Sequence, residues 1–196
     1  MPREARYEIQ VSRRLLTYRG KGPVEVGRVI DLDNSREVVA YIVYENHELS
    51  PSPYHVYGRY AETDAGTVFA IMIDDNYRRL FREKEKQFKA IVLHELGHHV
   101  CGHYEDEYWQ QFFSEEQRQG DMTELIRLER VRRVERGSVM PNELEADAFA
   151  CREVGKHTMN MMLDLLIEER RKRADGGAGL AIREFQLRKK AIRYLQ

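Results

Sequence analysis

The sequence has little of what marks secreted or membrane-spanning proteins. It contains two cysteines, Cys101 and Cys151, in no C-x-x-C arrangement, so we expect neither a disulfide scaffold nor an oxidising compartment. No apolar run approaches the ~18–20 residues that a membrane-spanning helix needs. The N-terminal stretch MPREARYEIQVSRR has no apolar segment of the kind that secretory signals carry. These absences predict a soluble, cytoplasmic protein without a membrane-spanning segment.

The sequence also lacks an excess of charge of either sign. Of its 196 residues, 32 are lysine or arginine and 33 are aspartate or glutamate, which leaves a formal net charge of −1. Proteins that bind nucleic acid through its phosphates usually carry a basic excess, so we expect no nucleic-acid partner. No feature of the composition indicates an oligomeric state.

The spacing of apolar residues changes once along the chain and predicts an α+β fold. Before Asp74, four segments alternate or are rich in β-branched and aromatic residues, with turn signals between them. These segments, which we expect to form an N-terminal antiparallel β-sheet, are residues 6–12, 38–44, 54–60 and 67–73. After Asp74 and Asp75, which can cap a helix, the spacing becomes helical and predicts a helical half.

The stretch HELGHH at residues 94–99 carries the strongest chemical signal. On a helix, His94 and His98 lie one turn apart on the same face and can place two imidazole nitrogens on one Zn²⁺. Glu95 lies beside them, where a carboxylate can take a proton from a water activated by zinc. This is the H-E-x-x-H pattern of zinc peptidases. Gly97, between the two histidines, would let another segment approach closely.

A catalytic zinc site needs a third protein ligand, and the stretch NELEADAFA at residues 142–150 contains candidates. Glu143 and Asp147 lie one helical turn apart. Glu143 can therefore bind the metal while Asp147 accepts a hydrogen bond from a ligand histidine. Glu145 is the alternative third ligand, but it lies on a different helix face and has no acidic residue four positions later. An acidic first helical turn would explain Glu143 alone, but not both motifs.

The two motifs resemble those of the gluzincin zinc metallopeptidases, with H-E-x-x-H followed by E-x-x-x-D. Over roughly residues 69–164 the sequence is similar to the catalytic core of the HtpX and CAAX prenyl protease type. The resemblance implies that the zinc ligands are His94, His98 and Glu143. It also implies that Glu95 is the general base and that Asp147 supports the ligands. Those proteases are built into membranes, and this chain shows no spanning helix, so their membrane substrates are not carried over.

The same resemblance concerns the apolar segment 67–73, which precedes the H-E-x-x-H helix. In gluzincins a strand at this place borders the cleft, and a substrate backbone can add to its edge. The sequence itself shows only an apolar strand in the right order. A central buried strand is therefore an equal alternative for this segment.

A second resemblance is to the ImmA/IrrE metallopeptidases, which cleave repressors or regulators. It rests on HELGHHVCGH at residues 94–103 and ELEADAFA at residues 143–150. The leucine-methionine-proline stretch expected soon after the second motif is replaced by CREVGKHTMNMM. Both affiliations therefore stay open.

Other residues near the motifs are candidates for further roles. Peptide hydrolysis needs a donor for the oxyanion of the tetrahedral intermediate. The candidate donors are Tyr104, Tyr108, His157 and Arg188. Cys101, at helical spacing from His98, either packs as a small apolar residue or blocks the fourth metal position. Gly102 is expected to end the helix, so that His103 turns away from the site.

These observations predict a zinc metalloendopeptidase of gluzincin type, with Zn²⁺ as its cofactor and a protein or peptide as its substrate. The expected organisation is a β-rich N-terminal region (1–74), a helical zinc-binding catalytic core (75–174) and a C-terminal basic helix (175–196). The alternatives are an ImmA/IrrE-like regulator-cleaving peptidase and a latent or non-enzymatic zinc-containing module that binds a protein partner.

Overall fold

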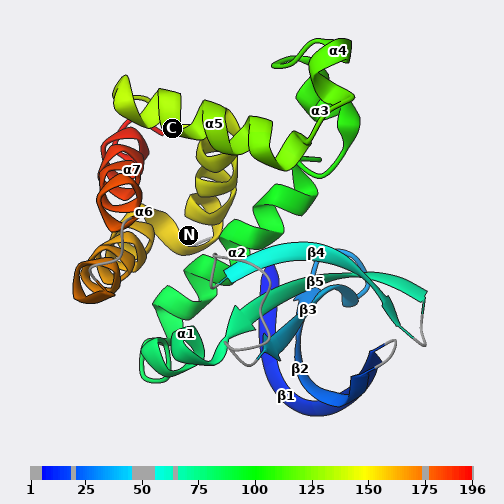
Figure 1. The fold of residues 1–196 in the computed structure, drawn as a ribbon. Helices are drawn as coiled ribbons and strands as arrows, with labels where there is room; N and C mark the ends of the chain where they lie inside the picture. The colour runs from blue at the N-terminus through cyan, green and yellow to red at the C-terminus, as the bar shows by residue number, and fades with distance from the viewer. Residues whose placement is uncertain (1–5, 19–20, 46–55, 64–65, 174–176, 196) are drawn as a thin grey trace. The chain divides into compact units, whose positions relative to one another are not determined.

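The computed structural model has an N-terminal sheet followed by helices, which confirms the α+β class (Figure 1). It describes residues 6–18, 21–45, 56–63, 66–173 and 177–195. The chain divides into two compact units, Met1–Leu96 and Gly97–Gln196. Because this division falls within helix α2 (Glu85–Val100), that helix contributes residues to both units.

Within the described residues, five strands form the sheet, in the order β1-β2-β3-β5-β4, and pairing of β1 with β4 closes it (Figure 1). The strands are β1 (Tyr7–Tyr18), β2 (Lys21–Asp31), β3 (Glu37–Glu45), β4 (Val56–Thr63) and β5 (Gly66–Asp74). The sheet is mixed, because β3 and β5 are parallel, whereas the other pairs are antiparallel as expected. The antiparallel prediction is wrong for this pair. Strand β5 lies between β3 and β4, runs antiparallel to β4 and therefore runs in the same direction as β3.

One strand, β2, was not foreseen in the sequence. Gly22 and Pro23 near its start are typical turn residues, but they lie at an irregularity in the pairing of β2 with β1, between the partners of Tyr18 and Leu16, and both residue types are tolerated at bulges. Strand β5, which contains the apolar segment 67–73, pairs with β3 and with β4, and its residues from Phe69 to Asp74 are buried. Of the two alternatives for this segment, the structure therefore shows the central buried strand.

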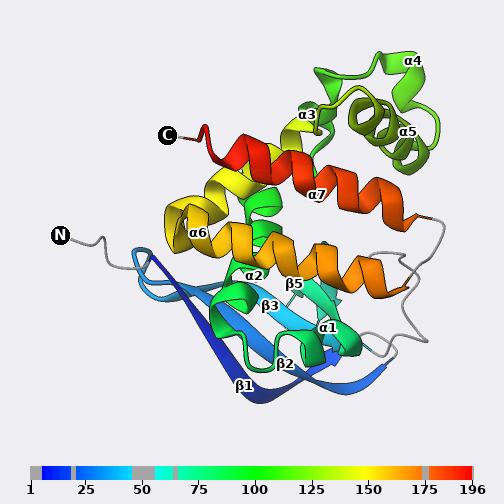
Figure 2. The same cartoon turned by 90° about the vertical axis from the view of Figure 1, so that its left-hand side faces the viewer.

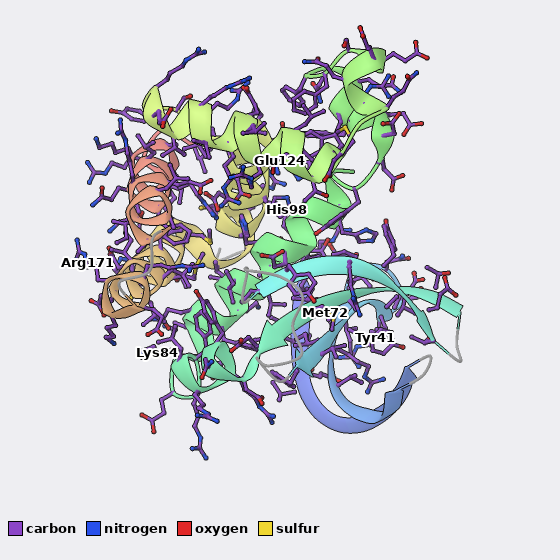
Figure 3. All side chains as sticks on the ribbon, viewed as in Figure 1. Tyr41, Met72, Lys84, His98, Glu124 and Arg171 are labelled. Carbon is purple, nitrogen blue, oxygen red and sulfur yellow. The ribbon has the colours of Figure 1, made fainter. Side chains whose placement is uncertain are left out.

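Apolar side chains from four strands pack together inside the sheet. They are Val26, Val43, Ala61, Ala70 and Met72. Tyr41 is partly buried and packs against this cluster, and Figure 3 shows it on the sheet together with Met72. The alternation of apolar residues that predicted strands therefore places one face of the sheet in a core.

Helix α1 (Asp75–Leu80) begins where the sheet ends, and Asp74 caps it as predicted, its side chain accepting from the backbone of Asn76 at 2.6 Å. After α2 the described helices are α3 (Asp106–Gln110), α4 (Glu115–Arg118), α5 (Met122–Glu135), α6 (Pro141–Arg173) and α7 (Ala178–Ile192). Within this set and in α1 and α2, no helix combines the length and apolar content needed to cross a bilayer.

Helix α6 is bent rather than continuous. The helical spacing of residues 142–172 predicts one uninterrupted helix, but Gly155 has φ 81° and ψ 152°, which breaks the helix into two segments. A positive φ is accessible to glycine at little cost because it has no Cβ. The two segments run in different directions, and α7 lies beside α6 (Figure 2).

Candidate metal centre

Two helices bring together the three predicted zinc ligands. His94 and His98 lie one turn apart on α2, and Glu143 lies in the first turn of α6. One ligand atom of each residue lies within 4.8 Å of the other two. Both histidines are buried, and Glu143 is half-buried. Figure 3 shows His98 on α2 among the side chains of the helices.

Close contact between α2 and α6 depends on Gly97, the residue between the two histidines. A Cβ at this position would lie 3.0 Å from the Cα and 3.1 Å from the carbonyl oxygen of Ala146. Such distances are tighter than almost all contacts of real Cβ atoms, so a larger residue here would have to push the backbone of Ala146 away by a few tenths of an ångström. The facing surface of α6 consists of Ala146, which is fully buried, and the Cβ of Phe149, 3.2 Å from the same position. The expectation that Gly97 admits another segment is confirmed.

The donor set suits zinc. Bonds of about 2.0–2.1 Å at tetrahedral angles place ligand atoms about 3.4 Å apart. The Nε2 of His98 and Oε1 of Glu143 are 3.9 Å apart, so a small side-chain rotation would bring them into that range. Two imidazoles and one carboxylate are a common ligand set of catalytic zinc. Glu95, next to His94 on α2, is buried, with 8% of its surface exposed.

Arg188 of α7 joins the two acidic residues of the second motif. It donates to Asp147 from Nε at 2.8 Å and from Nη2 at 2.5 Å, and to Glu143 from Nη1 at 2.8 Å. Burial opposes a charged guanidinium, but Asp147 and Glu143 outweigh it and hold the pKa of Arg188 above its ordinary value. The hydrogen bond from a ligand histidine to Asp147 stays a prediction. The ion pair between Asp147 and Arg188 was not foreseen from the sequence.

A second group of possible ligand atoms consists of Cys101, His103 and Glu145, also within 4.8 Å of one another. The expectation that His103 turns away is wrong. It is buried, its Nδ1 lies 2.9 Å from Nδ1 of His98, and its Nε2 lies 2.9 Å from Oε2 of Glu145. Glu145, the alternative third ligand, therefore faces His103, whereas Glu143 lies with the other predicted ligands.

The physical reason for the position of His103 is the way α2 ends. Gly102 has φ 72°, and the backbone N–H of His103 donates to the carbonyl of His98 at 2.9 Å. The N–H of Gly102 donates to the carbonyl of His99 at 3.1 Å, which completes a Schellman motif. This motif folds the chain back on the last turn of the helix. The glycine before His103 was the sequence signal that could have indicated it.

The candidate oxyanion donors lie in different places. Tyr104 is 38% exposed, and its ring centroid lies 6.5 Å from that of His98. Arg188 is near the ligands, but its guanidinium donates to the two carboxylates described above. His157 is exposed and lies beyond the break at Gly155. Tyr104 is therefore the candidate that combines exposure with a position beside a predicted ligand.

Neither cysteine has the environment of a reactive thiol. Burial, followed by the charge of Glu145, raises the pKa of Cys101. Burial, followed by the charge of Asp147, raises the pKa of Cys151 to about 12. A thiol is nucleophilic only as the thiolate, so the site contains no activated cysteine.

Comparison with known proteins finds no match to this chain among protein-family models, curated proteins or solved structures.

Proposed function

We propose that the protein is a zinc metallopeptidase that hydrolyses peptide bonds with water as the direct nucleophile. The observation that carries this proposal is the convergence of His94, His98 and Glu143, whose ligand atoms lie within 4.8 Å of one another. Its chemical support is the position of Glu95, a buried carboxylate next to a ligand on the same helix. The gluzincin resemblance assigns the same residues to the same roles.

His94, His98 and Glu143 would hold the metal. A bound Zn²⁺ supplies a Lewis acid that makes water more acidic and polarises the scissile carbonyl. Glu95 carries the proton: its carboxylate takes it from the attacking water and returns it to the departing amine. Arg188 keeps Glu143 and Asp147 in place through its three hydrogen bonds. The substrate would be a protein or peptide.

The proposal is tested with Glu95→Gln, which keeps the size of the side chain and removes its basicity. We expect about one zinc per chain in both proteins and at least about a 100-fold lower kcat/KM for peptide cleavage in the variant, because general-base catalysis contributes this much or more. Metal analysis and a cleavage screen on the same preparations provide both readouts. Glu85→Gln, an exposed residue of the same helix, is the matched control.

Normal cleavage by Glu95→Gln would contradict the mechanism. His94→Ala tests the ligands separately, because it should lose the zinc, and an unchanged metal content would contradict the assignment. Zinc-loaded wild-type protein that cleaves nothing in the screen would instead support a latent or non-enzymatic zinc-containing module.

A second candidate is a regulator-cleaving peptidase of the ImmA/IrrE kind, with the same ligands and base. This candidate rests on the stretches HELGHHVCGH and ELEADAFA, whose residues His98, His103 and Glu145 contact one another in sequence. The two candidates differ in substrate range. Strong cleavage of casein would support a general peptidase, whereas cleavage of one specific regulator with little activity on casein would support the second candidate.

A further inference from the structure

Three side chains of the second unit form a continuous chain of contacts that ends on a predicted zinc ligand. The Nδ1 atoms of His98 and His103 are 2.9 Å apart. On the far side of the second ring, Nε2 of His103 lies 2.9 Å from Oε2 of Glu145. His103 therefore contacts His98 with one ring nitrogen and Glu145 with the other.

The positions of the protons in this chain follow from the metal site. Nε2 of His98 lies on the side of Glu143, with 3.9 Å between Nε2 and Oε1. A nitrogen that binds a metal carries no proton, so with zinc on Nε2 the proton of neutral His98 would be on Nδ1. It would then be donated to Nδ1 of His103, which would carry its own proton on Nε2. That nitrogen faces Glu145, whose carboxylate can only accept.

Neighbouring rings and backbone hydrogen bonds hold His103 in place. Its side chain is 2% exposed. Its ring centroid lies 4.9 Å from that of His98 and 4.4 Å from that of Tyr108. Its carbonyl accepts from Nε1 of Trp109 at 3.0 Å, and its N–H donates to the carbonyl of His98 at 2.9 Å. The orientation of His103 is thus set by the fold and not by Glu145 alone.

We propose that His103 and Glu145 are positioning residues that orient His98 and hold its proton on Nδ1, so that Nε2 is presented to zinc. A carboxylate behind a histidine makes the ligand more basic and fixes its ring, and here His103 transmits that effect. This inference rests on the proposed zinc site. It assigns a function to Glu145, which the sequence suggested only as an alternative ligand.

The same geometry argues against a second metal at Cys101, His103 and Glu145, although their ligand atoms lie within 4.8 Å of one another. A metal on Nε2 of His103 would displace the proton that faces Glu145. Neutral His103 would then carry its proton on Nδ1, opposite the proton on Nδ1 of His98. Two donors 2.9 Å apart repel each other, so filling the first site disfavours filling the second.

The test is the zinc affinity of the full chain, measured by competition with a chromogenic chelator. His103→Ala should weaken zinc binding by about 10- to 100-fold, as loss of a residue that supports a ligand does. His103→Asn should recover most of this loss, because its Oδ1 can accept the proton of His98. Glu145→Gln changes a half-exposed residue and should weaken binding by a smaller factor. The matched control His99→Ala should stay within about twofold of wild type.

Nitrogen-15 NMR of the zinc-loaded protein gives a readout that a merely structural role would not change. We expect His98 protonated on Nδ1 and His103 protonated on Nε2, and His103→Asn should preserve the first of these tautomers. Wild-type affinity in His103→Ala, the opposite tautomers, or a second bound zinc that Cys101→Ser removes would each overturn the inference. In contrast, zinc-loaded wild type without peptidase activity would overturn the proposed function and leave this inference standing.

Discussion

At the scale of single residues, the histidines of HELGHHVCGH differ in their environments. His98 lies with the other predicted ligands, and His103 contacts it from behind. His99, one position after His98, is partly exposed, and burial lowers its pKa. Residue type and spacing identified His94 and His98, because i and i+4 positions share a helix face. They did not identify His103, which lies beyond the helix end.

The thiol of Cys151 provides a prediction with a defined pH dependence. Its pKa is raised from 9.0 to about 12, so the reactive thiolate is about 1000-fold scarcer at pH 7 than for an unshifted thiol. Alkylation of Cys151 by iodoacetamide should therefore be slow and should accelerate about tenfold per pH unit between pH 7 and 10. Mass spectrometry of the Cys151 peptide measures the rate, with urea-unfolded protein as the control. A plateau above pH 9 would contradict the expectation.

At the scale of elements, the site depends on how closely α2 and α6 approach. Gly97 of α2 lies opposite Ala146 of α6, and a Cβ at Gly97 would lie 3.0 Å from the Cα of Ala146. The approach places the first turn of α6, with Glu143, beside the histidines of α2. The distance between the two motifs thus depends on the packing of Gly97 against Ala146.

Substitution Gly97→Ala tests this coupling. In an isolated helix it would be favourable by about 1 kcal/mol, but here the added Cβ would lie 3.0 Å from the backbone of Ala146. Backbone atoms cannot rotate away, so we expect overpacking to cost about 1–3 kcal/mol of unfolding free energy and zinc affinity to fall as well. Urea unfolding and chelator competition measure the two effects.

Gly179→Ala is the matched control for this substitution, because a Cβ at Gly179 on α7 meets no atom within 4 Å. It should leave stability unchanged or raise it by up to about 1 kcal/mol. A Gly97→Ala protein as stable as the control, with unchanged zinc affinity, would show that the helices can separate without loss.

At the scale of the whole molecule, buried charges join helices α5, α6 and α7. Arg188 of α7 holds Asp147 and Glu143 of α6, and Arg130 of α5 donates to Glu184 of α7 at 2.8 Å. Burial, partly offset by Arg130, raises the pKa of Glu184. The helices of the second unit are therefore connected by ion pairs that are mostly shielded from water.

We expect Arg188→Leu to lower the free energy of unfolding by about 3–5 kcal/mol, because it leaves Asp147, which is fully buried, without its paired charge. Arg188→Lys should recover only part of this loss, since an ammonium cannot reproduce the bidentate contact. Denaturant unfolding at pH 7 is the measurement. Arg183→Leu, at an exposed position of α7, is the control and should change stability by less than about 1 kcal/mol. Equal effects of the two leucine variants would contradict the role of Arg188.

Local patterns were sufficient for the order of sheet and helices, for the cap at Asp74 and for the pair His94 and His98. Each of these depends on residues within a few positions of one another. The strand β2 was missed because Gly22 and Pro23 resemble a turn when read locally. The break in α6 was missed because a single glycine inside a helical pattern does not reveal its φ.

What the sequence by itself determined is a set of candidate site residues: two histidines one turn apart, a glutamate beside them, and an acidic pair on a later helix. Only the tertiary structure decided which residues contact this set. Arg188 contacts the acidic pair, and His103, itself in contact with Glu145, contacts His98. Arg188 and Asp147 are 41 positions apart, and His103 and Glu145 are 42 apart. Contacts across such separations depend on how whole helices pack, and helical periodicity specifies the face of a residue but not the element that will cover it.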